Sequence, residues 1–124
     1  MGIQSDVFFA HKACVSLPQE HVDMLVNRFG AVTHTNAEGT AYSMQSVKWY
    51  RDSDKDLEGF YIFLDMLYSS DYIVIEACHD YPGSTESDAG GWYDNPWEAY
   101  RFVRTGIEFN TRASKAIQHP KRKG

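Results

Sequence analysis

Hydrophobic and polar residues alternate with a period of two along several stretches of this chain, which is typical of strands with one buried face. Residues 6–15 and 40–50 alternate in this way, and residues 36–39 supply turn chemistry before the second stretch. Residues 71–79 are rich in Ile, Val and Tyr and predict a further strand. The strands that we expect are 6–15, 31–35, 40–50, 71–79 and 103–109.

Two other stretches place apolar residues three and four positions apart, as amphipathic helices do. We expect the first helix to begin with Ser16 as its N-cap, to hold Pro18 in its first turn, and to end before Gly30. We expect the second helix over 56–68, capped by Asp54 or by the serine before it. Helices and strands of these lengths suit a domain in which helices cover a sheet.

The predicted order β-α-β-β-α-β-β indicates an α+β two-layer sandwich, with two helices on one face of a mostly antiparallel sheet. Its first six elements follow the ferredoxin-like βαββαβ order, and 103–109 adds a C-terminal strand. That strand is expected to pair with 71–79, so that 79–97 becomes the link of a terminal hairpin. Residues 1–110 are predicted to form a single domain, followed by a basic, disordered tail at 111–124.

The predicted link, 79–97, is too long and too rich in Gly, Pro, Asp and Ser for an ordinary connection. Loops of this kind often have a function, and aromatic side chains supply large contact areas in protein interfaces. The same side chains could instead fold back and close one end of the sandwich as a small core. Both interpretations remain open for the four aromatic residues, which are the predicted partner-binding residues: Tyr81, Trp92, Tyr93 and Trp97.

Charge is unevenly distributed along the chain. Residues 111–124 hold five basic residues and no acid, which leaves 7 basic and 17 acidic residues in 1–110, a net charge of −10. An acidic body repels nucleic acid and favours basic partners. A nucleic-acid partner is therefore not expected for the body of the protein.

Polar side chains beside the link suggest a second kind of site. Glu76, His79 and Asp80 could form the polar part of a small-molecule pocket beneath 79–97. The spacing of the acids and histidines matches no metal-ligand motif, so no metal site is predicted. We expect no cofactor, because the chain contains no phosphate-binding glycine motif.

The cysteines do not indicate catalysis. Cys14 and His11 fall on opposite faces of their predicted strand, and so do Cys78 and His79. Two cysteines also make no disulfide framework. No catalytic residue is predicted, and enzymatic activity has no positive support in the sequence.

The distribution of apolar residues predicts the cellular location of the protein and a surface for self-association. The chain has neither an apolar run of the ~18 residues that a membrane span requires nor the features of a signal peptide, so a cytoplasmic protein without a membrane partner is expected. Ile62, Phe63 and Met66 widen the apolar surface of the second predicted helix beyond what one sheet face needs. A homodimer through this helix or through an open sheet edge would use that surface.

Four short pieces of the chain resemble small uncharacterised proteins of bacteriophages and prophages. They are Ser-Asp-Val at 5–7, Val-Lys-Trp-Tyr at 47–50, Asp-Tyr at 71–72 and Gly-Trp-Tyr-Asp-Asn-Pro at 91–96. The resemblance implies an accessory protein made in the host cytoplasm during infection or lysogeny. It implies no established activity and no catalytic residues.

These features leave three functions open. The first is a non-enzymatic protein-interaction module that binds a host or defence protein through an acidic surface and the aromatic link. The second is a small-molecule or nucleotide binder or hydrolase with a site beneath 79–97. The third is a structural or assembly component of a phage, which would form stable oligomers.

Overall fold

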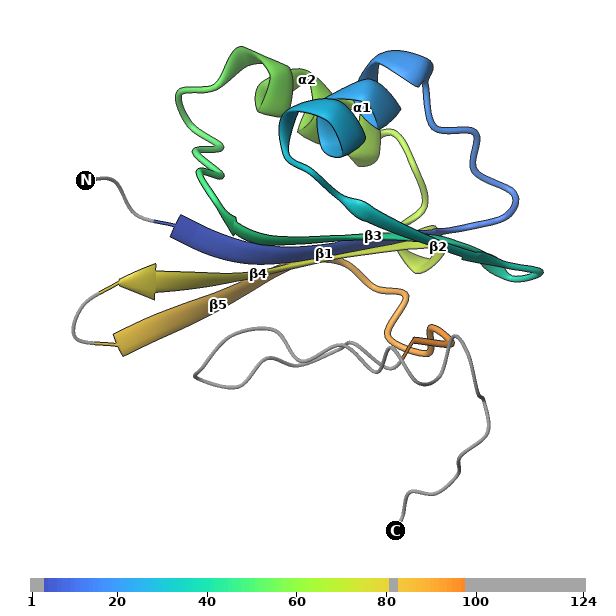
Figure 1. Cartoon of the computed structure of the whole chain (residues 1–124). Coiled ribbons are helices and arrows are strands. Elements are labelled where there is room, and N and C mark those ends of the chain that lie inside the picture. The colour runs from blue at the N-terminus through green and yellow to red at the C-terminus, as the bar shows by residue number, and fades with distance from the viewer. Residues whose placement is uncertain (1–3, 81–82, 98–124) are drawn as a thin grey trace, which may run out of the picture.

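The computed structural model describes residues 4–80 and 83–97 and shows one five-stranded antiparallel sheet. Two helices lie on one face of this sheet, and residues 91–97 lie on the other (Figure 1). The sheet order is β2-β3-β1-β4-β5. The elements are β1 (Gln4–Lys12), α1 (Gln19–Asp23), η1 (Met24–Arg28), β2 (Val32–Asn36), β3 (Gly39–Val47), α2 (Lys55–Asp65), η2 (Ser69–Asp71), β4 (Tyr72–Asp80) and β5 (Gly83–Gly90).

The α+β class, the antiparallel sheet and the two helices are confirmed, but the fifth strand is not the predicted one. Residues 83–90, expected to be part of a loop, form β5 and pair with β4 along its whole length. Because β4 also pairs with β1, both of its edges are occupied, and the predicted pairing of 103–109 with β4 is wrong. The sheet order thus differs from the predicted one, and a ferredoxin-like order is not confirmed. Residues 103–109 and the 111–124 tail lie outside the described residues.

Alternation along β1 and β4 gives the sheet two apolar faces. Val7 and Phe9 point to the helix side, where Phe60 of α2 meets the Phe9 ring edge-on at 5.0 Å. Phe8 and Ala10 point to the opposite face and belong to a second cluster. We call the two clusters the helix-side core and the opposite-face core. Burying both faces explains why β1 is buried at almost every position.

The first helix differs from its prediction. It starts at Gln19 after Pro18, not at a Ser16 cap, and no side chain caps it. Its second half is a π-helical turn, η1, in which the Phe29 amide donates to the Met24 carbonyl at 3.0 Å. Gly30, with a φ of 71°, ends the helix as predicted.

The start of α2 is confirmed. The Asp54 carboxylate accepts hydrogen bonds from the amides of Asp56 and Leu57, which makes it the N-cap. Arg28 of η1 binds the same carboxylate and reaches Asp56 at 2.8 Å. This ion-pair group joins the end of the first helical segment to the start of the second.

Candidate functional site

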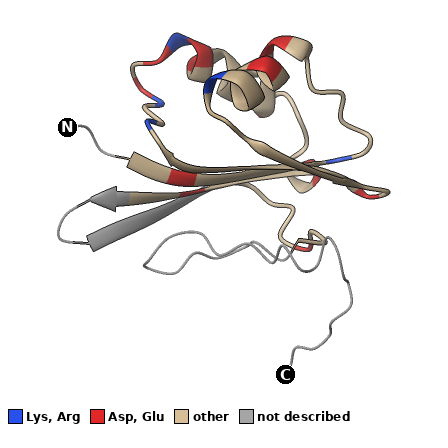
Figure 2. Cartoon of the chain, viewed as in Figure 1, with Lys and Arg blue, Asp and Glu red and all other residues tan. Residues whose placement is uncertain are grey.

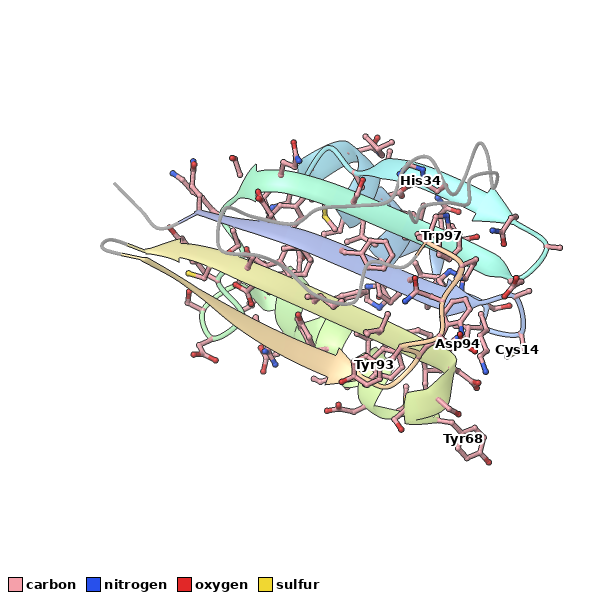
Figure 3. The ribbon with its side chains drawn as sticks, turned by 90° about the horizontal axis from the view of Figure 1, so that it is seen from below. Cys14, His34, Tyr68, Tyr93, Asp94 and Trp97 are labelled. Carbon is pink, nitrogen blue, oxygen red and sulfur yellow. The ribbon has the colours of Figure 1, made fainter. Side chains whose placement is uncertain are left out.

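The two described tryptophans of the predicted link are buried on the opposite face of the sheet. Trp92 is 6% exposed and Trp97 is 2% exposed, and their ring centroids lie 6.0 Å apart in an edge-to-face arrangement. Trp97 also approaches Phe8 of β1, at 6.4 Å. Figure 3 shows Trp97 lying over the strands. The arrangement is that of the small core considered as an alternative, because these rings pack against their own sheet.

Backbone geometry places the tryptophans there. Gly90 ends β5 with a φ of 82°, and a Cβ at this position would lie 2.4 Å from the Tyr72 carbonyl oxygen, so only glycine fits. The chain then turns under the sheet, and the Gly91 and Trp92 amides both donate to that carbonyl at 3.0 Å. The Asn95 side chain stabilises this turn: it is buried, donates to the Trp92 carbonyl and accepts from the Trp97 amide.

The other two predicted partner-binding residues have different positions. Tyr93 is 46% exposed, whereas Tyr81 lies outside the described residues. The aromatic link therefore offers one accessible side chain among its three described aromatic residues. The partner-binding role of the four stays a prediction.

Other large apolar side chains are exposed on α2 and in the turn that follows it. The Gly91 amide donates to the Ser69 carbonyl at 2.7 Å, which ties the segment after β5 to the turn that follows α2. In Figure 3, Tyr68 projects from the same side of the molecule on which Tyr93 lies. We refer to the exposed apolar side chains of α2, of the turn after it and of the segment after β5 as the α2-end patch; its members and exposed fractions are Ile62 (56%), Met66 (72%), Tyr68 (81%) and Tyr93 (46%).

Sequence reasoning found only part of the α2-end patch. The sequence predicts Ile62 and Met66 as surplus apolar surface of the helix, and it places Tyr68 inside the predicted helix 56–68. The helix ends at Asp65, so Tyr68 follows it in an extended conformation and points outward. Helix ends are the least predictable part of a helical pattern.

The α2-end patch lies in the acidic half of the chain. From 56 to 97 the sequence has nine acidic residues and no Lys or Arg: Asp56, Glu58, Asp65, Asp71, Glu76, Asp80, Glu86, Asp88 and Asp94. All five basic residues between 4 and 97 come from the first 55 positions. In Figure 2 they lie on the helix layer, on the segment leading into α2 and at the end of β1. An apolar patch in acidic surroundings suits a partner that is apolar with a basic rim.

Of the three residues of the predicted polar pocket, the structure describes the side chain of Glu76. Glu76 is half-buried on the helix side of β4 and lines a cavity of about 530 Å³ with Ser5 and Cys78. The other wall of this cavity is residues 49–53, not the link 79–97. His79 and Asp80 belong to β4, but their side chains are not among those described. Glu76 thus lines a cavity of its own on the helix side, and the predicted pocket of Glu76, His79 and Asp80 beneath 79–97 stays a prediction.

A second hollow, of about 590 Å³, separates the two helical segments. Arg28, Asp56 and His21 are among the residues that line it. The Arg28 guanidinium is bound by two carboxylates, and hydrogen bonding to Arg28 lowers the pKa of Asp54. His21 packs against Phe60 and Phe63. These polar groups are used in holding the helices together.

Cys14 is not on a strand, contrary to prediction. β1 ends at Lys12, and Cys14 is exposed in the turn that follows. His11 is buried, its Nδ1 donates to the Lys12 carbonyl at 2.9 Å, and burial lowers its pKa. Within the described ranges, no three His, Cys, Asp or Glu side chains gather as a metal site would require. No helix in that part of the chain has the length and apolar character of a membrane span.

Comparison with known proteins finds no counterpart: no family model, curated protein or solved structure matches this chain. The functional argument therefore depends on the α2-end patch and on the cavity beside Glu76.

Proposed function

We propose that this protein is a non-enzymatic protein-interaction module whose contact surface is the α2-end patch. The observation that supports this most directly is the exposure of Met66 and Tyr68, two large side chains of which 72% and 81% are accessible. Monomeric proteins expose single apolar residues routinely, but clustered ones often mark a binding surface. Tyrosine and methionine are also enriched in protein interfaces.

The charge around the patch supports a specific kind of partner. Asp65 precedes Met66 and Asp94 follows Tyr93, whereas Asp71, which ends the turn after Tyr68, lies 3.8 Å from the Lys12 ammonium. We expect the partner to present an apolar pocket surrounded by Lys or Arg. The resemblance to phage proteins makes a host or defence protein the natural class of partner.

The proposal is tested by affinity capture from a bacterial lysate. We expect Met66→Glu and Tyr68→Ala to weaken capture of the partner by about 30-fold or more, because truncation at the centre of an interface costs about 2 kcal/mol or more. Val32→Ala is the matched control, since Val32 is 58% exposed on β2 at the other edge of the sheet. Folded variants that retain every partner would contradict the proposal.

Self-association is distinguished by light scattering. A protein that is monomeric alone and forms a complex with the captured partner supports the interaction module. A dimer or larger oligomer that Met66→Glu converts to a monomer would instead favour the structural or assembly component, because the patch would then contact a second copy of the chain.

A further inference from the structure

The cavity beside Glu76 has two chemically different walls. On one wall, Ser5 of β1 meets Glu76 and Cys78 of β4. The other wall is residues 49–53, the segment that rises from β3 to α2, which includes both Arg51 and Asp52. Its volume of about 530 Å³ falls within the range of small-molecule sites, which is roughly 300–1,000 Å³.

A β-bulge separates the two walls. Ser5 pairs with Val47 and Val7 pairs with Met44, so two residues of β3 face one residue of β1. Ser46 lies in this bulge and has a φ of 56°, the only positive φ of a non-glycine residue among the described residues. Its amide donates to the Asp6 carboxylate at 2.8 Å. The bulge bends β3 at the border of the cavity, and strained bulges of this kind occur beside functional sites.

The aromatic wall is built around the buried Trp49. Trp49 is 3% exposed, and its Nε1 donates to the Tyr61 hydroxyl at 3.0 Å. The Arg51 guanidinium lies 4.1 Å from the centre of the Tyr61 ring. Burial raises the pKa of Tyr61 to about 12, so its hydroxyl stays neutral at physiological pH. The exposed Arg51 side chain is thus a cation that stacks on an aromatic face, and its hydrogen-bonding edge suits an anion.

The sheet wall presents an oriented carboxylate. The Ser5 hydroxyl, on a residue only 2% exposed, donates to Glu76 Oε2 at 2.9 Å. A carboxylate has about four acceptor positions, so it can receive further donors beside the partners it already has. The cavity therefore combines an oriented carboxylate, a second carboxylate at Asp52 and the Arg51 guanidinium with an aromatic surface.

We propose that this cavity binds a small zwitterion of the amino-acid class. The ligand's ammonium group is received by Glu76, its carboxylate by Arg51, and its side chain packs against Trp49 and Tyr50. The lining holds two carboxylates, Glu76 and Asp52, and one guanidinium, Arg51. A purely anionic ligand would meet both carboxylates, and a purely cationic one would meet Arg51, whereas a molecule with both charges meets partners of each sign. The site shares no residue with the α2-end patch, so the two proposals stand or fall separately.

The experiment uses the full-length protein and the twenty L-amino acids as probes, in saturation-transfer NMR followed by calorimetric titration. We expect saturable binding of at least one of them. The N-acetylated amide of the same amino acid, which has neither charge, should bind at least tenfold more weakly. Failure of all twenty to bind, or equal binding of the uncharged derivative, overturns the proposal.

Variants locate the site. Arg51→Gln and Glu76→Gln should each weaken binding about 10- to 100-fold, the usual effect of removing a charge-assisted hydrogen bond. Lys48→Gln and Glu38→Gln are matched controls on exposed residues that do not line the cavity, and they should leave affinity unchanged. Equal losses in the controls would overturn the assignment. If Glu76→Gln does not fold, the affinity of Arg51→Gln and the comparison of the amino acid with its N-acetylated amide still test the proposal.

Discussion

At the residue scale, the three described aromatic residues of the 79–97 link have two different roles. Trp92 and Trp97 are packed into the opposite-face core, whereas Tyr93, between them in sequence, faces outward. Trp97 Nε1 is buried without a hydrogen-bond partner among the described residues. Burying a donor without a hydrogen-bond partner costs about 1–3 kcal/mol of folding free energy, so the packing of the indole must outweigh this cost. Composition could not separate these roles, since all three are large aromatics in a polar segment.

Trp97→Ala should therefore lower the free energy of unfolding by about 3–5 kcal/mol, because it leaves a large cavity under the sheet. Tyr93→Ala should change it by no more than about 0.5 kcal/mol, as expected for an exposed side chain. Urea denaturation followed by circular dichroism measures both values. Similar values for the two variants would contradict the core assignment of Trp97.

At the scale of elements, strands with strong patterns were predicted well and the edge strand was missed. β1, β3 and β4 contain alternating or continuous apolar residues, and each was expected within a few residues of its position. β5 reads Gly-Ser-Thr-Glu-Ser-Asp-Ala-Gly, which has none of the preferred strand residues except Thr85. It is a strand because β4 offers it a free edge of backbone groups. Acids at an edge also discourage unwanted pairing with other chains.

The α2 cap gives a prediction at this scale. Hydrogen bonding to Arg28 holds the pKa of Asp54 below its ordinary value, so the carboxylate stabilises the fold above the unfolded-state pKa of about 3.9. This contribution is lost as pH falls through the lower, folded-state pKa. Asp54→Asn keeps a capping acceptor but removes the charge, and Asp54→Ala removes both.

We expect both Asp54 variants to be less stable than wild type at pH 7, with Asp54→Ala lower by about 1 kcal/mol more because it loses the cap. The gap between wild type and Asp54→Asn should narrow in strongly acidic solution. Urea midpoints at pH 7 and at progressively lower pH provide the test. A gap that widens on acidification would show that the charge of Asp54 does not stabilise this helix start.

At the scale of the whole molecule, charge is divided between two parts of the sequence. Residues 4–97 hold 15 acidic and 5 basic residues, a net charge of −10, and residues 98–124 hold 7 basic and 2 acidic residues, a net charge of +5. Within the first part, the acids are concentrated from 56 onward. Such an excess of one sign opposes compaction through self-repulsion.

Raising NaCl from about 10 mM to about 150 mM shortens the Debye length from ~30 Å to ~8 Å and should increase the unfolding free energy by up to about 1 kcal/mol. A double variant, Asp65→Asn with Asp94→Asn, removes two exposed acids and should show a smaller increase. Denaturation curves in urea, which is uncharged, measure the effect. Destabilisation by salt would indicate that attraction between opposite charges dominates instead.

The sequence by itself determined the elements whose side chains carry a strong period: the two helices, the hairpin of β2 and β3, and the central strands. It also indicated the α+β class, because those elements can bury their apolar faces only in layers. Tertiary structure alone decided which segment became the fifth strand, which tryptophans were buried, and that Glu76 lines a cavity with residues 49–53. The physical reason is that backbone pairing at a sheet edge and the direction of the chain after Gly90 depend on neighbours distant in sequence. Side-chain periodicity does not record such neighbours.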